Sequence, residues 1–103
     1  MSTNRLHADL RREELLRVAL DVAERDGWAN ITHASVAAAA GVSAPLVVAR
    51  LGTKTNLLRD VMRRAVSDRR VRVVAEGLAR GNTQARKADE ALRVMASEWV
   101  RDA

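Results

Sequence analysis

A short break between two helix-forming stretches, within the segment Thr32–Leu58, constrains the fold of this chain more than any other feature. An alanine-rich stretch runs into Gly41, and two residues later Ser43 opens a second apolar stretch. Glycine readily adopts the left-handed conformation that ends a helix, and a serine side chain caps the free N–H groups of the next one. The sequence therefore predicts two short helices, 32–40 and 44–51, joined by a tight turn.

The second of these helices has the features of a recognition helix. In a helix-turn-helix, the second helix enters the major groove of DNA. Ala37 in the first helix is small enough to let the two helices cross closely. Three apolar residues are spaced so that they face inward: Val42 in the turn, and Val47 and Leu51 on the second helix. We therefore interpret residues 44–51 as a recognition helix and the chain as a nucleic-acid binder.

The composition indicates one small helical domain. Of the 103 residues, 48% are hydrophobic, mostly Ala, Val and Leu, and Trp28 and Trp99 are the two aromatic residues. No apolar run approaches the length of a membrane span, and the first seven residues lack the apolar core of a signal peptide. We expect a cytoplasmic protein, associated with the nucleoid and not with a membrane. Without cysteine there is no disulfide or thiolate zinc site, and we expect neither metal nor cofactor.

The positive charge is concentrated in one segment. Residues 1–42 carry five basic and six acidic side chains, residues 43–72 carry eight and two, and residues 73–103 carry five and five. The excess of the whole chain, +5, thus comes from the recognition helix and the helix after it, where a phosphate-neutralising surface would lie. The alternative is a solvated arginine-rich helix face, which applies most to Arg69, Arg70 and Arg72.

Capping and apolar spacing place the other helices. Residues 1–8 are polar and unpatterned and are interpreted as a flexible arm, and Asp9 caps a helix that runs to about Asp26. Trp28 follows the glycine that ends this helix and is expected to fill the base of a three-helix core. The second helix is capped by Thr32.

The rest of the chain is predicted to form two more helices. Thr53 caps a helix that continues to about Arg80 through the polar segment 67–70, and Asn82 or Thr83 caps the last one. The predicted fold is all-α: a three-helix helix-turn-helix domain (9–66), then one long helix and one further C-terminal helix (67–103).

Residues 67–103 are interpreted as a dimerisation segment. The apolar stripes of these two helices cannot all be covered by a three-helix domain, so a second copy of the chain is the simplest cover. The residues expected at this homodimer interface are Val73, Leu78, Leu92, Met95 and Trp99.

An ordered set of short motifs between residues 11 and 66 resembles a known family. The motifs are Gly27-Trp28, Ile31-Thr32, Val36-Ala37, Ala40-Gly41-Val42-Ser43, Leu51, Gly52-Thr53-Lys54 and Leu57-Leu58. In this order and spacing they are similar to the DNA-binding region of tetracycline-repressor-like (TetR family) transcriptional regulators. The resemblance implies a dimeric regulator, a repressor in most cases, that binds double-stranded DNA at a palindromic site.

The resemblance and the helix-turn-helix geometry together imply a set of DNA contacts. The first turn of the recognition helix would present Ala44, Pro45, Val48 and Ala49 to the major groove, while phosphates would be reached by Thr32, Ser43, Thr53 and Lys54. Small apolar side chains contact the thymine methyl but make no bidentate contact to guanine or adenine. Specificity is therefore expected from Arg50, His33, Arg5 and DNA shape. His33 as a metal ligand is the weaker alternative.

The sequence departs from the family in two respects. The family usually has a tyrosine at the position of Val48, often a phosphate contact, and an aromatic residue at that of Leu51. It also continues into a large helical domain that binds small molecules and dimerises. With about two helices after the motif, this chain is either a minimal relative or a truncation, and we expect no pocket for a drug-like effector.

Two other functional classes were compared with DNA binding. An enzyme is not expected, because the chain has no cysteine, no phosphate-cradling glycine loop and no nucleophile with a paired base. A protein-interaction module such as an antirepressor remains the alternative, since an apolar recognition helix could instead dock on another regulator.

Overall fold

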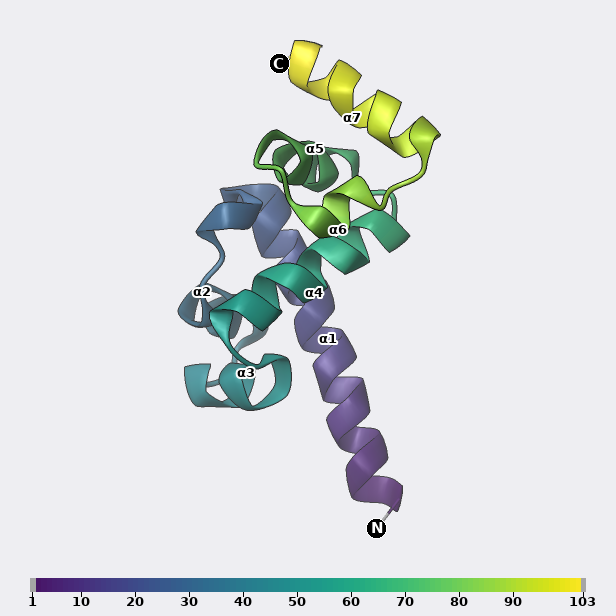
Figure 1. Cartoon of the computed structure of the whole chain (residues 1–103). Coiled ribbons are helices and arrows are strands. Elements are labelled where there is room, and N and C mark those ends of the chain that lie inside the picture. Colours follow the sequence, from purple (N-terminus) through teal and green to yellow (C-terminus); the bar gives the residue numbers. More distant parts are fainter. Residues whose placement is uncertain (1, 103) are drawn as a thin grey trace.

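The computed structural model describes the backbone of residues 2–102 and the side chains of residues 11–100. This part of the chain is an all-α globule without strands (Figure 1). Its helices are α1 (Ser2–Asp26), α2 (His33–Ala40), α3 (Ala44–Leu51), α4 (Lys54–Ser67), α5 (Val71–Ala79), α6 (Thr83–Arg86) and α7 (Glu90–Asp102), with a 3-10 turn η1 (Trp28–Asn30). Among the described residues, no single helix is long and apolar enough to cross a membrane. Helices α2 and α3 meet the length and hydropathy requirement only when taken together, as a bent pair.

Helix α1 is longer than the sequence indicated. Its apolar residues at helical spacing, Leu16, Ala19, Leu20 and Ala23, are all buried. The helix begins at Ser2 and not after Asp9, so the prediction of a separate arm over 1–8 is wrong for residues 2–8. No glycine or proline interrupts the sequence there, and extending an existing helix fixes only one residue for each added hydrogen bond.

The turn between α2 and α3 is formed as predicted. Gly41 adopts the left-handed conformation (φ 70°), and the Val42 N–H donates back to the Ala37 carbonyl at 3.0 Å. The Ser43 hydroxyl accepts the Leu46 N–H and so caps α3. The chain bends by 110° between the two helices, and Val47 and Leu51 of α3 are buried in the core.

The long fourth helix that we predicted is two helices. Helix α4 ends at Ser67, and Arg69 takes a left-handed conformation (φ 55°). The N–H of Arg70 then donates to the Ala65 carbonyl and that of Arg69 to the Val66 carbonyl, the two hydrogen bonds of a Schellman motif. The helix therefore stops where an arginine occupies the position that usually holds glycine.

The predicted last helix is also divided. Asn82 accepts the N–H groups of Gln84 and Ala85 and caps only the short α6. Helix α7 starts afresh because the Asp89 carboxylate accepts the Leu92 N–H. That hydrogen bond, and then the one from Arg69, hold the pKa of Asp89 below its usual value. A side chain that bonds nearby N–H groups favours a new helix start over continuation.

Trp28 joins three parts of the fold. The side chain is buried, and its indole N–H donates to the Leu58 carbonyl of α4 at 2.9 Å. The main-chain N–H groups of Trp28 and Ala29 both donate to the Glu76 carboxylate of α5, each at 2.8 Å. The expectation that Trp28 fills the base of the core is confirmed, and α5 is thereby attached to the junction between α1 and α2.

Gly77 is the position at which α5 approaches its neighbours most closely, and it generates a stability prediction. A Cβ there would overlap the Met62 side chain and would lie 2.8 Å from Cβ of Ala85. We expect Gly77→Val to lower the free energy of unfolding by about 3 kcal/mol through overpacking. The control is Ala79→Val on the exposed side of α5, which should change it by less than about 0.5 kcal/mol. Equal urea midpoints for the two variants would show that the packing around Gly77 is loose.

Candidate nucleic-acid interface

Helix α3 presents a continuous uncovered face. Val47 and Leu51 are buried against the core, whereas Pro45, Val48 and Ala49 are exposed, with Val48 at 46%. At about 100° per residue these three positions lie on one side of the helix, and Ala44 borders them. The face is formed entirely by apolar side chains, as predicted, and it offers methyl groups without any hydrogen-bonding group.

Hydroxyl side chains cap the helices on either side of this face. Thr32, Ser43 and Thr53 accept the N–H groups of Ser35, Leu46 and Asn56, respectively, at 2.9–3.3 Å. Each cap uses a lone pair of the hydroxyl oxygen, so the hydroxyl hydrogen is free to be donated to an anion. The Ser35 hydroxyl in turn binds the N-terminus of α2, which completes a capping box.

His33 brings the starts of α2 and α4 together. Its Nε2 lies 2.7 Å from the carbonyl oxygen of Gly52, the residue that ends α3. Because a carbonyl only accepts, Nε2 carries the proton in this contact. Thr32 and His33 are thus held near Thr53 and Lys54, and the exposed Lys54 side chain forms no ion pair with any described residue. The imidazole already has a structural partner, which leaves it one nitrogen for other contacts.

Arg50 does not lie with the exposed face of α3. It is about 100° or more around the helix from Pro45, Val48 and Ala49. The side chain is half-buried, and its Nε is buried without a hydrogen-bond partner among the described residues. The structure therefore places Arg50 beside the predicted reading face and not in it. Arg5 lies outside the residues whose side chains are described.

Much of the positive charge of residues 43–72 is neutralised by carboxylates from other segments. Arg64 hydrogen-bonds Glu13 at 2.6 Å and Asp68 at 3.1 Å, and these two contacts, in that order, raise its pKa. Arg69 pairs with Asp89 at 2.8 Å. These arginines were counted as free charge in the sequence, but their partners lie twenty or more residues away in the chain, apart from Asp68.

Arg70 is neutralised in the same way, by Glu24 at 3.0 Å and Asp21 at 3.5 Å on α1. Among the described residues, Arg72 forms no ion pair. The alternative of a solvated arginine-rich face therefore fits Arg72, whereas Arg69 and Arg70 are paired with carboxylates. Within α3 and the first turn of α4, whose side chains are all described, Arg50 and Lys54 are the basic residues, and neither forms an ion pair with a described residue.

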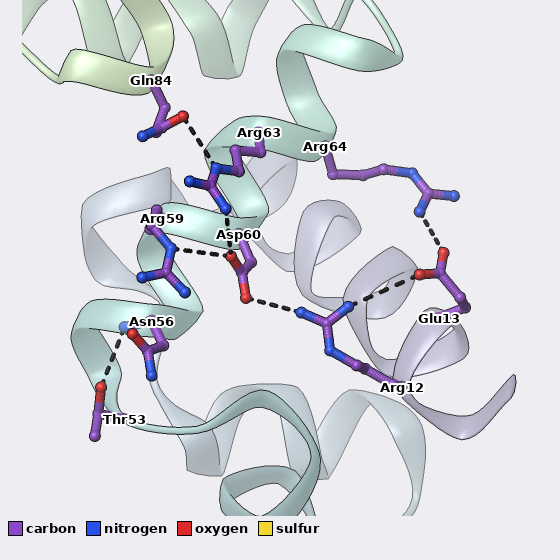
Figure 2. A network of polar contacts seen from close by, with 9 residues as sticks. All are labelled: Arg12, Glu13, Thr53, Asn56, Arg59, Asp60, Arg63, Arg64 and Gln84. Carbon is purple, nitrogen blue, oxygen red and sulfur yellow. Dashed lines mark hydrogen bonds and ion pairs between the residues drawn. The ribbon is translucent and has the colours of Figure 1, made fainter. Parts of the chain in front are cut away.

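A buried carboxylate that sequence reasoning missed organises the arginines between α1 and α4. Asp60 is 7% exposed and accepts hydrogen bonds from Arg12 at 2.9 Å and Arg59 at 3.1 Å, with Arg63 at 3.8 Å (Figure 2). The sequence signal is an aspartate at the edge of the apolar stripe of α4, one turn after Leu57. A charged group in such a position is expected only with a paired partner.

The residues predicted at a dimer interface separate into two groups. Val73 and Leu92 are 1% exposed in the single chain, because α5 and α7 pack on each other. Their assignment to an intersubunit surface is therefore wrong. Leu78 is partly buried, whereas Met95 and Trp99 are 39% and 47% exposed, next to exposed Val94 and Val100. On α7, Met95 and Trp99 thus lie beside the buried Leu92, at the border of the side that packs on α5, and Val94 and Val100 are exposed elsewhere around the helix.

The comparisons with known proteins add no family to these observations. No family model, curated protein or solved structure matches this chain. In the described part of the chain, no group of three His, Asp or Glu side chains could hold a metal ion. The geometry of the residues themselves therefore has to support any proposal about function.

Proposed function

We propose that this protein is a sequence-specific, double-stranded DNA-binding transcriptional regulator, a repressor, and that it acts in the cytoplasm at the nucleoid. The observation that supports the proposal is the pair of α2 and α3. Two eight-residue helices meet at 110° across a glycine turn, with α3 uncovered on the side opposite the core. This is the arrangement of a helix-turn-helix. We also propose that the chain belongs to the TetR family.

In this proposal the contacts fall into two kinds. The first turns of α3 enter the major groove, where Ala44, Pro45, Val48 and Ala49 pack on thymine methyl groups. Phosphates are bound by the hydroxyls of the three caps and by Lys54, all at helix N-termini, where backbone N–H groups and the helix dipole favour anions. With Arg50 beside the reading face, sequence discrimination depends on methyl contacts and DNA shape.

A homodimer is part of the proposal. Met95 and Trp99, beside the packed side of α7, form an exposed apolar surface that is costly in water, since each large apolar side chain gains about 1.5–3 kcal/mol on full burial. A second copy packed on α7 would cover it and would place two α3 helices on one side of the DNA. The operator would then be a palindrome with half-sites about one helical turn, or a multiple of it, apart.

One observation favours a second candidate function. The face of α3 has no polar side chain for base recognition, and Arg64, Arg69 and Arg70 are paired within the chain. A protein-interaction module, such as an antirepressor that docks through Val48 and its neighbours, would use such a face directly. The two candidates differ in their response to salt.

The first prediction for DNA binding concerns this response. The apparent affinity for a mixed-sequence duplex should fall with salt, with a slope of about −0.9 in log K against log salt for each phosphate contacted. Because neutral hydroxyl groups release no counterions, Lys54 and Arg50 set the expected slope at about −1 to −2 per subunit. Fluorescence anisotropy between low and physiological salt measures it. Absence of binding at low salt would favour the protein-interaction candidate.

The second prediction separates phosphate contacts, which position the protein on DNA, from the contacts that recognise the bases. Lys54→Ala should weaken binding to all sequences alike and reduce the salt slope by about 1, because a phosphate contact carries no base information. Val48→Ala should leave the slope unchanged and reduce discrimination between the preferred site and random DNA, by about 1 kcal/mol for the methyl groups lost. Arg50→Ala is the matched control: since Arg50 lies off this face, site preference should survive. If Arg50→Ala prefers a different DNA sequence, Arg50 contributes to base recognition and the prediction is wrong.

The third prediction concerns the dimer. Trp99 is half-exposed in the single chain, so Trp99→Ala should alter the monomer's unfolding free energy by less than about 1 kcal/mol. The same change should shift sedimentation from dimer to monomer at micromolar concentration and weaken binding to a palindrome. Glu98→Ala, at a neighbouring exposed position, serves as the control. A wild-type protein that sediments as a monomer would contradict the prediction.

A further inference from the structure

A cavity between α1 and α4 combines an apolar floor with a positively charged rim. It is a shallow depression of about 310 Å³, widely open to solvent, and is lined by Arg12, Leu16, Asp60, Arg63, Arg64 and Ser67. Leu16 belongs to the core and forms the floor, while the polar side chains surround the opening. The lining comes from two helices that the chain already joins through Asp60 and Arg12.

Arg63 and Arg64, which line this cavity, have N–H groups that form no hydrogen bond with a described residue. Arg63 uses Nε for Gln84 and keeps Nη1 at 3.8 Å from Asp60, which is beyond hydrogen-bond distance. Arg64 uses Nε and Nη1 for Asp68 and Glu13. The structure shows no hydrogen bond from Nη2 of either arginine, or from the Ser67 hydroxyl, to a described residue. Figure 2 shows how the existing contacts hold the Arg12 and Arg63 side chains toward Asp60.

The charge of the cavity is positive on either way of counting. Three guanidinium groups and one carboxylate form the lining. When the neighbours that pair with them are included, four arginines (with Arg59) face three carboxylates (with Glu13 and Asp68). A doubly charged phosphate matches the excess of the lining, and guanidinium groups bind its oxygens with paired, directed hydrogen bonds.

We propose that this cavity binds a small phosphorylated molecule, a phosphate monoester, through its phosphate group. Arg63 and Arg64 donate their free N–H groups and Ser67 its hydroxyl to the phosphate oxygens. The free oxygen lone pairs of Asp60 accept a hydroxyl group of the ligand, so that a hydroxylated ester is favoured over a plain anion. The volume has room for the phosphate and a few further atoms, and not for a drug-sized effector.

The cavity is separate from the proposed DNA contacts. Its α4 residues, from Asp60 to Ser67, lie roughly 9 to 20 Å along the helix from Lys54. A DNA backbone bound at the N-terminus of α4 would therefore not fill it. A ligand in the cavity would bridge α1 to α4 and stabilise the folded chain by an amount that rises with the logarithm of its concentration once that exceeds the dissociation constant.

The test is a titration of the free protein with inorganic phosphate, followed by amide and arginine side-chain NMR signals. Sodium chloride at matched ionic strength serves as the reference. We expect saturable shifts at Arg12, Arg63, Arg64 and Ser67, with a dissociation constant on the order of 1 mM. Arg63→Gln and Ser67→Ala, both at exposed positions, should each weaken phosphate binding, the former about tenfold or more. Arg72 is an exposed arginine outside the cavity, so Arg72→Gln should leave the affinity for phosphate unchanged.

Absence of saturable shifts, equal shifts with chloride, or equal affinity in Arg63→Gln and Arg72→Gln would overturn the proposal. A second titration, with duplex DNA present, identifies the source of the phosphate. Retained phosphate binding supports a small ligand, whereas displacement of phosphate by DNA would assign the cavity to the DNA backbone and overturn the small-molecule assignment. Because the first titration contains no DNA, its result is independent of whether the protein binds DNA.

Discussion

The contact between Glu76 and the junction of α1 and α2 holds the two halves of this protein together. Its carboxylate accepts the N–H groups of Trp28 and Ala29, while the Trp28 indole donates to the Leu58 carbonyl. Loss of Glu76 would leave two partly buried backbone donors unpaired, each at a cost of about 1–3 kcal/mol. Helix α5, and α7 packed on it, are thereby fixed to the base of the α2 and α3 pair, so a partner bound at α7 would have a rigid connection to α3.

The parts of the fold that could be predicted from the sequence are those set by local contacts. The turn at Gly41 and the caps at Thr32, Ser43 and Thr53 each depend on residues within five positions, and all formed as predicted. The two breaks that were missed have different causes. Arg69 ends α4 in a conformation typical of glycine, and Asp89 starts α7 inside an apolar pattern that continues across the break.

The candidate site could be predicted only in part, because its electrostatics depend on contacts between distant segments. The apolar face of α3 follows from helical spacing, and it is present. The pairing of Arg64 with Glu13 and of Arg70 with Glu24 joins residues more than forty positions apart, which no local pattern indicates. The orientation of Arg50, and the burial of Asp60 among three arginines, likewise follow from how α1, α3 and α4 pack.

The central claim, that α3 and the capped helix starts beside it form the nucleic-acid surface, is tested most directly by mapping amide NMR shifts on addition of a short DNA duplex at low salt. We expect the largest shifts on residues 32–33, 44–49 and 53–54, and no shifts on α7 when the oligomeric state is unchanged. Shifts confined to α7 or to the cavity between α1 and α4, or no shifts at all, would contradict it.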